Sequence, residues 1–264
     1  MPQVNQTLHR AARAPWRWAV AWWRIVHFGA LMLVLALSPS SYGAANRQAM
    51  ARHIYLDTAP VLTWFTVLCA LVSLVITRIV VVTALSYGLT QYALEMVIRV
   101  LVLELIPLTA ALFVALRCTI PNGAELAQMR RRGQLDALRA QGVDPVASEL
   151  LPRVVAGMFS VITLAALSCV VAMVLAYLAV YGFTLAGLPA YTRMFGQVFN
   201  PAVTLVFTLK TLFFSLAVSL MPMAAGLYES NPAGWRTSDE LQGLVRVFAV
   251  LVLIEVVSLV GNYY

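Results

Sequence analysis

VVAGMFSVITLAALSCVVAMVLAYLAVYGFTLAGL, residues 154–188, contains no charged residue. The stretch is longer than the roughly 20 apolar residues that a helix needs to cross the hydrocarbon core of a bilayer. In lipid, the chain must satisfy its backbone hydrogen bonds internally, and a helix does so within one segment. We therefore predict a transmembrane helix here, at about 152–183.

Four other apolar runs flank this stretch on both sides. They predict further transmembrane helices at about 59–85, 92–117, 198–225 and 243–262. The few charged residues well inside these runs are Arg78, Glu95, Arg99, Glu104, Lys210 and Glu255. The predicted fold class is thus an all-α membrane protein with five spans.

The composition of the whole chain agrees with this class. Of 264 residues, 61% are hydrophobic and 11% are charged, and the mean hydropathy is +0.84. Soluble domains carry roughly 25% charged residues, so a soluble globular fold is excluded. So much apolar surface also excludes a disordered chain, and five spans leave no room for a soluble catalytic domain.

The N-terminal region before the first span is rich in Arg and Trp. We predict an interfacial helix at about 9–38, because Trp16, Trp18, Trp22 and Trp23 crowd one short segment and Trp favours the membrane–water interface. The alternative is a secretory signal, with 28–37 as its apolar core and 38–45 as its small-residue segment. A short polar helix is expected at 44–57, before the first span.

The arginines predict the orientation in the membrane. Seventeen of the 18 basic residues are Arg, which leaves Lys210 as the sole lysine. Cytoplasmic loops of membrane proteins are rich in Arg and Lys. Fourteen of the arginines lie in the N-terminal region and in the segments 117–153 and 228–246, whereas the loops near 86–91 and 189–199 hold only Arg193. We therefore expect a cytoplasmic N-terminus and an outer C-terminus, and a nucleic-acid partner is not expected.

The longest polar stretch, 117–153, predicts a connecting helix at about 123–141. Asn122 followed by Glu125 has the spacing of a capping box. Gly133 is expected to interrupt the helix, Gly142 to end it, and Asp144-Pro145 to form a turn. Its apolar stripe allows a helix that rests on the membrane or one that docks a cytoplasmic partner; the stripe consists of Leu126, Met129, Leu135 and Leu138.

The second span and this connector carry a family resemblance. They contain, in order, ELIPLTAAL at 104–112, Arg117, ELAQMR at 125–130, QLDAL at 134–138, GVDP at 142–145 and LPR at 151–153. This order and spacing resemble the MlaE/YrbE family, the permeases of ABC lipid transporters that work with MCE proteins. The sequence departs from the family pattern in that Ile106, Leu116, Ala127 and Gly133 replace residues typical of it.

The resemblance implies a homodimeric inner-membrane permease that moves phospholipid or a similar molecule to or from a periplasmic MCE protein and helps maintain outer-membrane lipid asymmetry. It implies a cytoplasmic ATPase dimer, which would hold the ATP and Mg, and allows a small STAS-type regulator. No cofactor is expected in this chain, which has no GxxxxGK[ST] motif. The residues implied in ATPase coupling are Glu125, Met129, Arg130, Gln134, Leu135, Asp136 and Leu138. A bulky charge at Leu135 or Leu138 is then expected to release the ATPase.

Ionisable residues inside the spans are candidates for the lipid path, because charge at bilayer depth is costly and usually faces a cavity or a partner. Glu104 and Lys210 match charged positions of the family, and Leu103 stands where many members have Arg. Arg99 lies one turn earlier and could replace that Arg. The implied substrate-binding set is Lys210, Glu104, Arg99, Leu103 and Pro107. The alternative is structural, with Glu104 paired to Arg99 or Lys210, while Arg78 and Glu255 snorkel or join helices.

Other chemistry has little support in the sequence. His53 and Asp57 have helical spacing but are too few for a closed metal site, and the three cysteines are expected to be buried thiols. A membrane-embedded lipid-modifying enzyme would need a cluster of His, Asp or Glu at one membrane face, which is not seen. A purely structural membrane subunit is the other alternative, and the intramembrane Lys210 and Glu104 argue against it.

Overall fold

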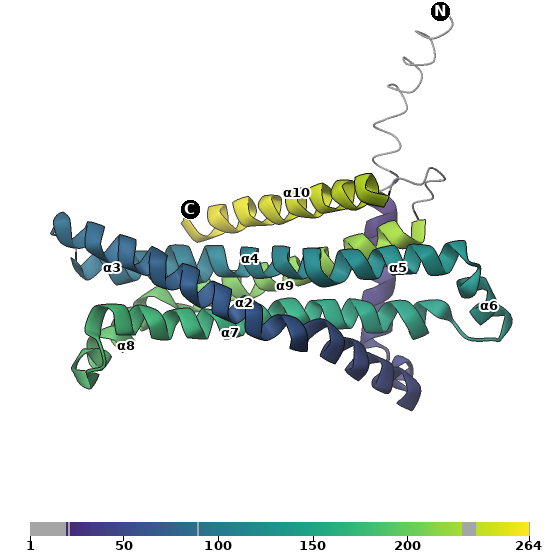
Figure 1. Ribbon diagram of the computed structural model, residues 1–264, viewed down its shortest axis with the longest axis horizontal. Helices are drawn as coiled ribbons and strands as arrows, with labels where there is room; N and C mark the ends of the chain where they lie inside the picture. Colours follow the sequence, from purple (N-terminus) through teal and green to yellow (C-terminus); the bar gives the residue numbers. More distant parts are fainter. Residues whose placement is uncertain (1–19, 21, 89, 229–235, 264) are drawn as a thin grey trace, which may run out of the picture.

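The computed structural model describes residues 20, 22–88, 90–228 and 236–263, and every regular element in this part of the chain is helical. Five helical segments are long and apolar enough to cross a membrane, as predicted. They are Asn46–Ser86, Tyr92–Arg131, Val146–Tyr181, Pro201–Tyr228 and Gly243–Gly261. Figure 1 shows them running side by side as an elongated bundle.

A shorter apolar helix, Trp22–Leu37, precedes the bundle and lies across its end in Figure 1. Its Phe28 and Met32 are buried, whereas Trp23 and Val34 on other faces are exposed. The described part of this helix is shorter than the roughly 20 apolar residues that a span needs. Apolar side chains on both its packed and its open faces fit the predicted interfacial helix, of which residues 9–19 and 21 lie outside the described residues. The short helix η1 (Pro39–Tyr42) follows.

The first span is one continuous helix, α2 (Ala44–Ser86), with Pro60 inside it. Residues 44–57 are helical as expected, but they form the first part of α2 and not a separate helix before the span. Proline removes one backbone donor, but membrane helices tolerate it where neighbouring helices support the segment. Beside Pro60, Thr58 hydrogen-bonds Ser160 of α7 at 2.7 Å, which ties α2 to the bundle at this point.

The second span and the first part of the connector also form one helical run. It consists of α3 (Thr90–Val97), the π-helix η2 (Ile98–Leu105), α4 (Ile106–Val114), the π-helix η3 (Ala115–Thr119) and α5 (Ile120–Arg131). The predicted capping box is wrong, because Asn122 lies inside α5. Its amide donates instead to Asp57 Oδ2 in α2 at 3.0 Å.

The connector then turns as the glycines predicted. Gly133 has a φ of +71°, a conformation that favours glycine, and separates α5 from α6 (Gln134–Ala140). Gly142, with a φ of +78°, follows α6. Asp144 Oδ1 accepts the backbone N–H of Val146 at 3.0 Å and begins the next helical run, the π-helix η4 (Val146–Leu150) and α7 (Leu151–Tyr181).

The remaining elements are η5 (Leu185–Gly187), α8 (Leu188–Val198), α9 (Pro201–Tyr228) and α10 (Arg236–Tyr263). Helix α8 occupies a segment that the sequence suggested to be a loop. Its Tyr191 hydroxyl donates to Met173 O in α7 at 2.9 Å. In Figure 1, α8 lies at one end of the bundle, whereas α6 and the helix Trp22–Leu37 lie at the other, here called the α6 end.

Two apolar clusters fill the bundle. The larger lies between the spans, and its members come from α2, α3, η2, α4, η3, α7, α8, α9 and α10. The smaller, at the α6 end, joins the N-terminal helix to the connector and to the ends of α7 and α9. It consists of Phe28, Met32, Met50, Leu126, Leu135, Leu150, Leu151, Val154, Met223 and Ala224.

Candidate functional site

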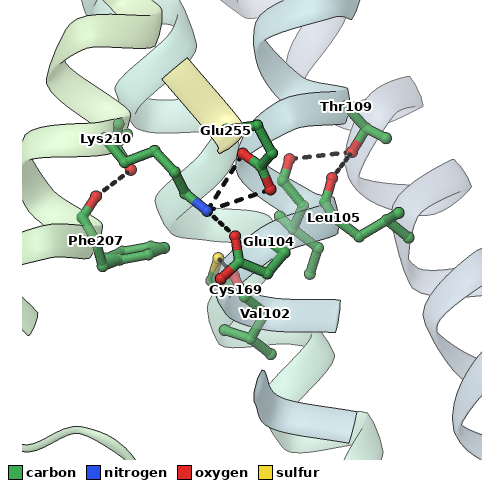
Figure 2. A network of polar contacts seen from close by, with 10 residues as sticks. Val102, Glu104, Leu105, Thr109, Cys169, Phe207, Lys210 and Glu255 are labelled. Atoms are coloured by element: carbon green, nitrogen blue, oxygen red, sulfur yellow. Dashed lines mark hydrogen bonds and ion pairs between the residues drawn. The ribbon is translucent and has the colours of Figure 1, made fainter. Parts of the chain in front are cut away.

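Three ionisable side chains from three helices meet inside the bundle, as Figure 2 shows. The Lys210 ammonium, on α9, forms an ion pair with Glu104 Oε2 in η2. It also lies 3.4 Å and 3.5 Å from the two carboxylate oxygens of Glu255 in α10. We call Glu104, Lys210 and Glu255 the charged cluster.

The Lys210 side chain lies deep in the bundle. Lys210 is 2% exposed, although it is the sole lysine of the chain. It follows Pro201 by nine residues, which is about 14 Å at a rise of 1.5 Å per residue. The hydrocarbon core is roughly 30 Å thick, so Lys210 lies near the middle of the bilayer if α9 spans it.

Irregular helical geometry positions Glu104. It belongs to the π-helix η2, and Pro107 follows without a backbone N–H to donate into that segment. Side chains take up the carbonyls of this region: Thr109 Oγ1 donates to Leu105 O at 2.8 Å, and Cys169 Sγ lies 3.5 Å from Val102 O (Figure 2). Single π-helical turns are frequent at functional sites.

The charged cluster has an excess of acceptors over donors. When all three groups are ionised it has two negative charges and one positive charge. Glu104 Oε1 and Glu255 Oε2 are buried and have no hydrogen-bond partner among the described residues. A buried ammonium is tolerated because it is paired, and removal of any one member leaves uncompensated charge. The charged cluster can therefore join the three helices or, when they separate, expose charge to a polar headgroup.

The other residues of the predicted lipid-binding set lie around the charged cluster without joining it. Arg99 pairs with Glu95 one turn earlier, with Nε–Oε1 at 3.0 Å, so the structure pairs Glu104 with Lys210 and not with Arg99. Leu103 and Pro107 are buried in the bundle. Glu255, which the sequence suggested as a helix-joining residue, links α10 to α9 through Lys210.

Arg78, the other intramembrane charge, is exposed on α2.

The predicted coupling residues divide by exposure. Glu125, Gln134 and Asp136 are exposed on α5 and α6. Leu135 is 4% exposed and belongs to the smaller apolar cluster. The others are half-buried; they are Met129, Arg130 and Leu138. The Arg130 guanidinium donates to Leu227 O at the end of α9.

One buried charge was not among the predicted site residues. Arg153, near the start of α7, is 4% exposed and forms ion pairs with Glu149 at 2.9 Å and with Glu125 at 3.7 Å. The signal in the sequence was a single Arg directly before the charge-free stretch 154–188.

The three cysteines are free and buried, as predicted. In the part of the chain that the structure describes, no three His, Cys, Asp or Glu side chains are grouped to hold a metal ion.

The segments that carry the family resemblance, 104–112 and 117–153, lie in η2, α4 and the helical connector, and Glu104 of the first segment belongs to the charged cluster. The family model described as Permease MlaE matches residues 50–260. The chain belongs to the MlaE permease family. A search of curated proteins found no match.

Membership in the MlaE permease family has three consequences. The chain is a permease subunit of an ABC transporter. It is therefore a component of a transporter rather than an enzyme. The family is one of bacterial inner-membrane permeases, and five apolar helices fit a multi-pass member. The match includes the charged cluster and the whole connector.

Proposed function

We propose that this MlaE permease moves phospholipid, or a similar hydrophobic molecule, between the inner membrane and a periplasmic MCE protein, and so helps maintain outer-membrane lipid asymmetry. The observation that carries the proposal is the charged cluster. A lysine at mid-membrane depth, paired with carboxylates from two other helices, is costly for a purely structural subunit.

The charged cluster and the apolar spans would share the binding of a lipid. Acyl chains need only apolar walls, whereas a headgroup needs polar contacts that the spans otherwise lack. Lys210 can offer its ammonium to a phosphate when α9 or α10 moves, since Glu104 and Glu255 occupy it in this conformation. We propose Lys210 and Glu104 as the polar contacts of the path, with Leu103 and Pro107 in its wall and Arg99 nearer its outer end.

The proposed assembly is a homodimer of this chain with a cytoplasmic ATPase dimer, which holds ATP and Mg, and a periplasmic MCE protein. A STAS-type regulator is a further proposed partner. We propose a cytoplasmic N-terminus and a periplasmic C-terminus, because most of the arginines lie in the N-terminal region and in the segments 117–153 and 228–246. The exposed side chains of α5 and α6 then face the ATPase.

The test is lipid transfer by the purified complex in liposomes. Lys210→Ala is expected to reduce ATP-dependent transfer of a fluorescent phospholipid while the ATPase still copurifies. Thr208→Ala is the matched control, because the Thr208 hydroxyl is exposed and donates to Thr204 O of its own helix. Equal transfer by Lys210→Ala and the wild type, at equal amounts of complex, would remove Lys210 from the path.

A further inference from the structure

The Arg153 side chain bridges two helices at the α6 end. From α7, its Nη1 donates to Glu149 Oε2 at 2.9 Å and to Glu149 O at 3.2 Å. Its Nη2 reaches α5, 3.7 Å from Glu125 Oε1 and 3.7 Å from Met129 Sδ. The same guanidinium is thus oriented by one helical run and attached to the other.

The surroundings of Arg153 do not need a charge for packing. Leu126, Leu150, Leu151 and Val154 lie in the smaller apolar cluster beside it, and each is at most 3% exposed. A buried ion pair can often be replaced by apolar residues with no loss of stability. The rigid fork of arginine can, however, hold the hydrogen bond to Glu149 and the ion pair with Glu125 in one geometry. We therefore expect the bridge to specify how α5 lies against α7.

Helix α5 is attached to α9 in a different way. There the two backbones touch, since a Cβ on Gly123 would lie 2.5 Å from Pro222 O. The Arg130 guanidinium adds a bond to Leu227 O. The backbone of α5 thus contacts α9 directly, whereas the long side chain of Arg153 links α5 to α7.

Helix α7 leads from Arg153 to the charged cluster. Its Cys169 thiol donates to Val102 O in η2, the π-helix that holds Glu104 (Figure 2). A displacement of α7 would therefore change two contacts. One is the ion pair of Arg153 with Glu125 in α5, and the other is the hydrogen bond of Cys169 with Val102 in η2.

We propose that Arg153 is a positioning residue that passes displacement of α5 to α7 during the ATPase cycle. The inference rests on the proposed function, since it assumes that a partner ATPase moves α5. Glu125 is the point at which α5 acts on the guanidinium, and Glu149 keeps the guanidinium aimed at α5.

The test is the amount of lipid transferred per ATP hydrolysed by the complete transporter in liposomes, for Arg153→Gln against the wild type. We expect the ATPase to copurify and to hydrolyse ATP, while transfer per ATP falls by roughly fivefold or more, the usual size of an allosteric coupling. Arg153→Lys is expected to lie between the two, because one ammonium cannot serve both acceptors with arginine's geometry. Arg52→Gln removes an exposed arginine from α2 as the matched control.

Two outcomes would overturn the inference. One is an unchanged ratio in a folded Arg153→Gln complex, including the case in which ATP hydrolysis and lipid transfer fall in the same proportion, because that result indicates a purely structural role. If Arg153→Gln does not accumulate, Glu125→Gln takes away only the α5 half of the bridge and is expected to lower the ratio less; an unchanged ratio there again overturns it. A wild-type complex without ATP-dependent lipid transfer would instead overturn the proposed function itself.

Discussion

Gly226 in α9 touches the carbonyl of Gly123 in α5, and neither residue has room for a side chain. Small residues allow backbones to approach closely where helices cross in membranes. This crossing fixes the connector to the helix that carries Lys210, sixteen residues earlier in α9. The predicted partner surface and the charged cluster are therefore parts of one packed unit.

The crossing predicts that Gly226→Ala destabilises the chain. A methyl group there would overlap the Gly123 backbone, and overpacking of this kind costs about 1–3 kcal/mol. Thermal unfolding of the purified chain in detergent measures the loss. Gly196→Ala in α8, where the added methyl meets nothing within 4 Å, should unfold at the wild-type temperature or above it. Equal melting temperatures for the two variants would contradict the crossing.

The charged cluster predicts different results for one substitution and for three. Lys210→Met leaves Glu104 and Glu255 buried without their cation, which should cost roughly 3–5 kcal/mol. The combined variant Glu104→Gln, Lys210→Met, Glu255→Gln removes every charge and should melt close to the wild type.

Lipid transfer separates structure from function in these variants. If the charged cluster contacts the transported lipid, the stable triple variant transfers little lipid. If the charged cluster only joins helices, the triple variant transfers lipid as the wild type does. Melting curves and transfer by the same preparations give both answers.

The number of spans and their approximate positions could be predicted from hydropathy, because a span needs only a long enough run of apolar residues within one segment. Features that depend on contact between distant helices did not follow. Asn122 has the local pattern of a cap, but its amide bonds Asp57 of α2, and the helix continues through it. A local pattern does not contain the position of another helix.

The site was predicted in part for the same reason. Lys210 and Glu104 were candidates because charges are rare in apolar runs, and Lys210 was one of two partners considered for Glu104. The choice between Arg99 and Lys210 depends on how the π-helix η2 is turned, and neither periodicity nor spacing reveals a π-helix. Glu255 was considered as a helix-joining residue, but its pairing with Lys210 depends on how α10 packs against α9.

Gly133 predicts a conformational effect on partner binding. Its φ is +71°, and an added methyl would meet nothing within 4 Å, so only the backbone opposes a substitution. In Gly133→Ala, the left-handed backbone conformation at this position should become about 1–2 kcal/mol less favourable. The backbone should then leave this conformation and turn α6 away from its present direction. We expect less ATPase to copurify with Gly133→Ala. Gly133→Asn, which tolerates this conformation better, should retain more; the reverse order would show that the turn does not set the partner surface.

The exposed face of α6 predicts where a docked ATPase is most sensitive to charge. The sequence suggested Leu135 as a test position, but Leu135 is 4% exposed and packs in the smaller apolar cluster. Leu135→Asp should therefore reduce the amount of folded chain, because a buried unpaired carboxylate is costly.

The neighbouring Asp136 has a side chain that is 77% exposed. Asp136→Arg should leave thermal unfolding nearly unchanged, since surface substitutions usually alter stability by about 0.5 kcal/mol or less, and yet release the ATPase in a pull-down. Retention of the ATPase by a folded Asp136→Arg chain would place the docking surface elsewhere on the α6 end.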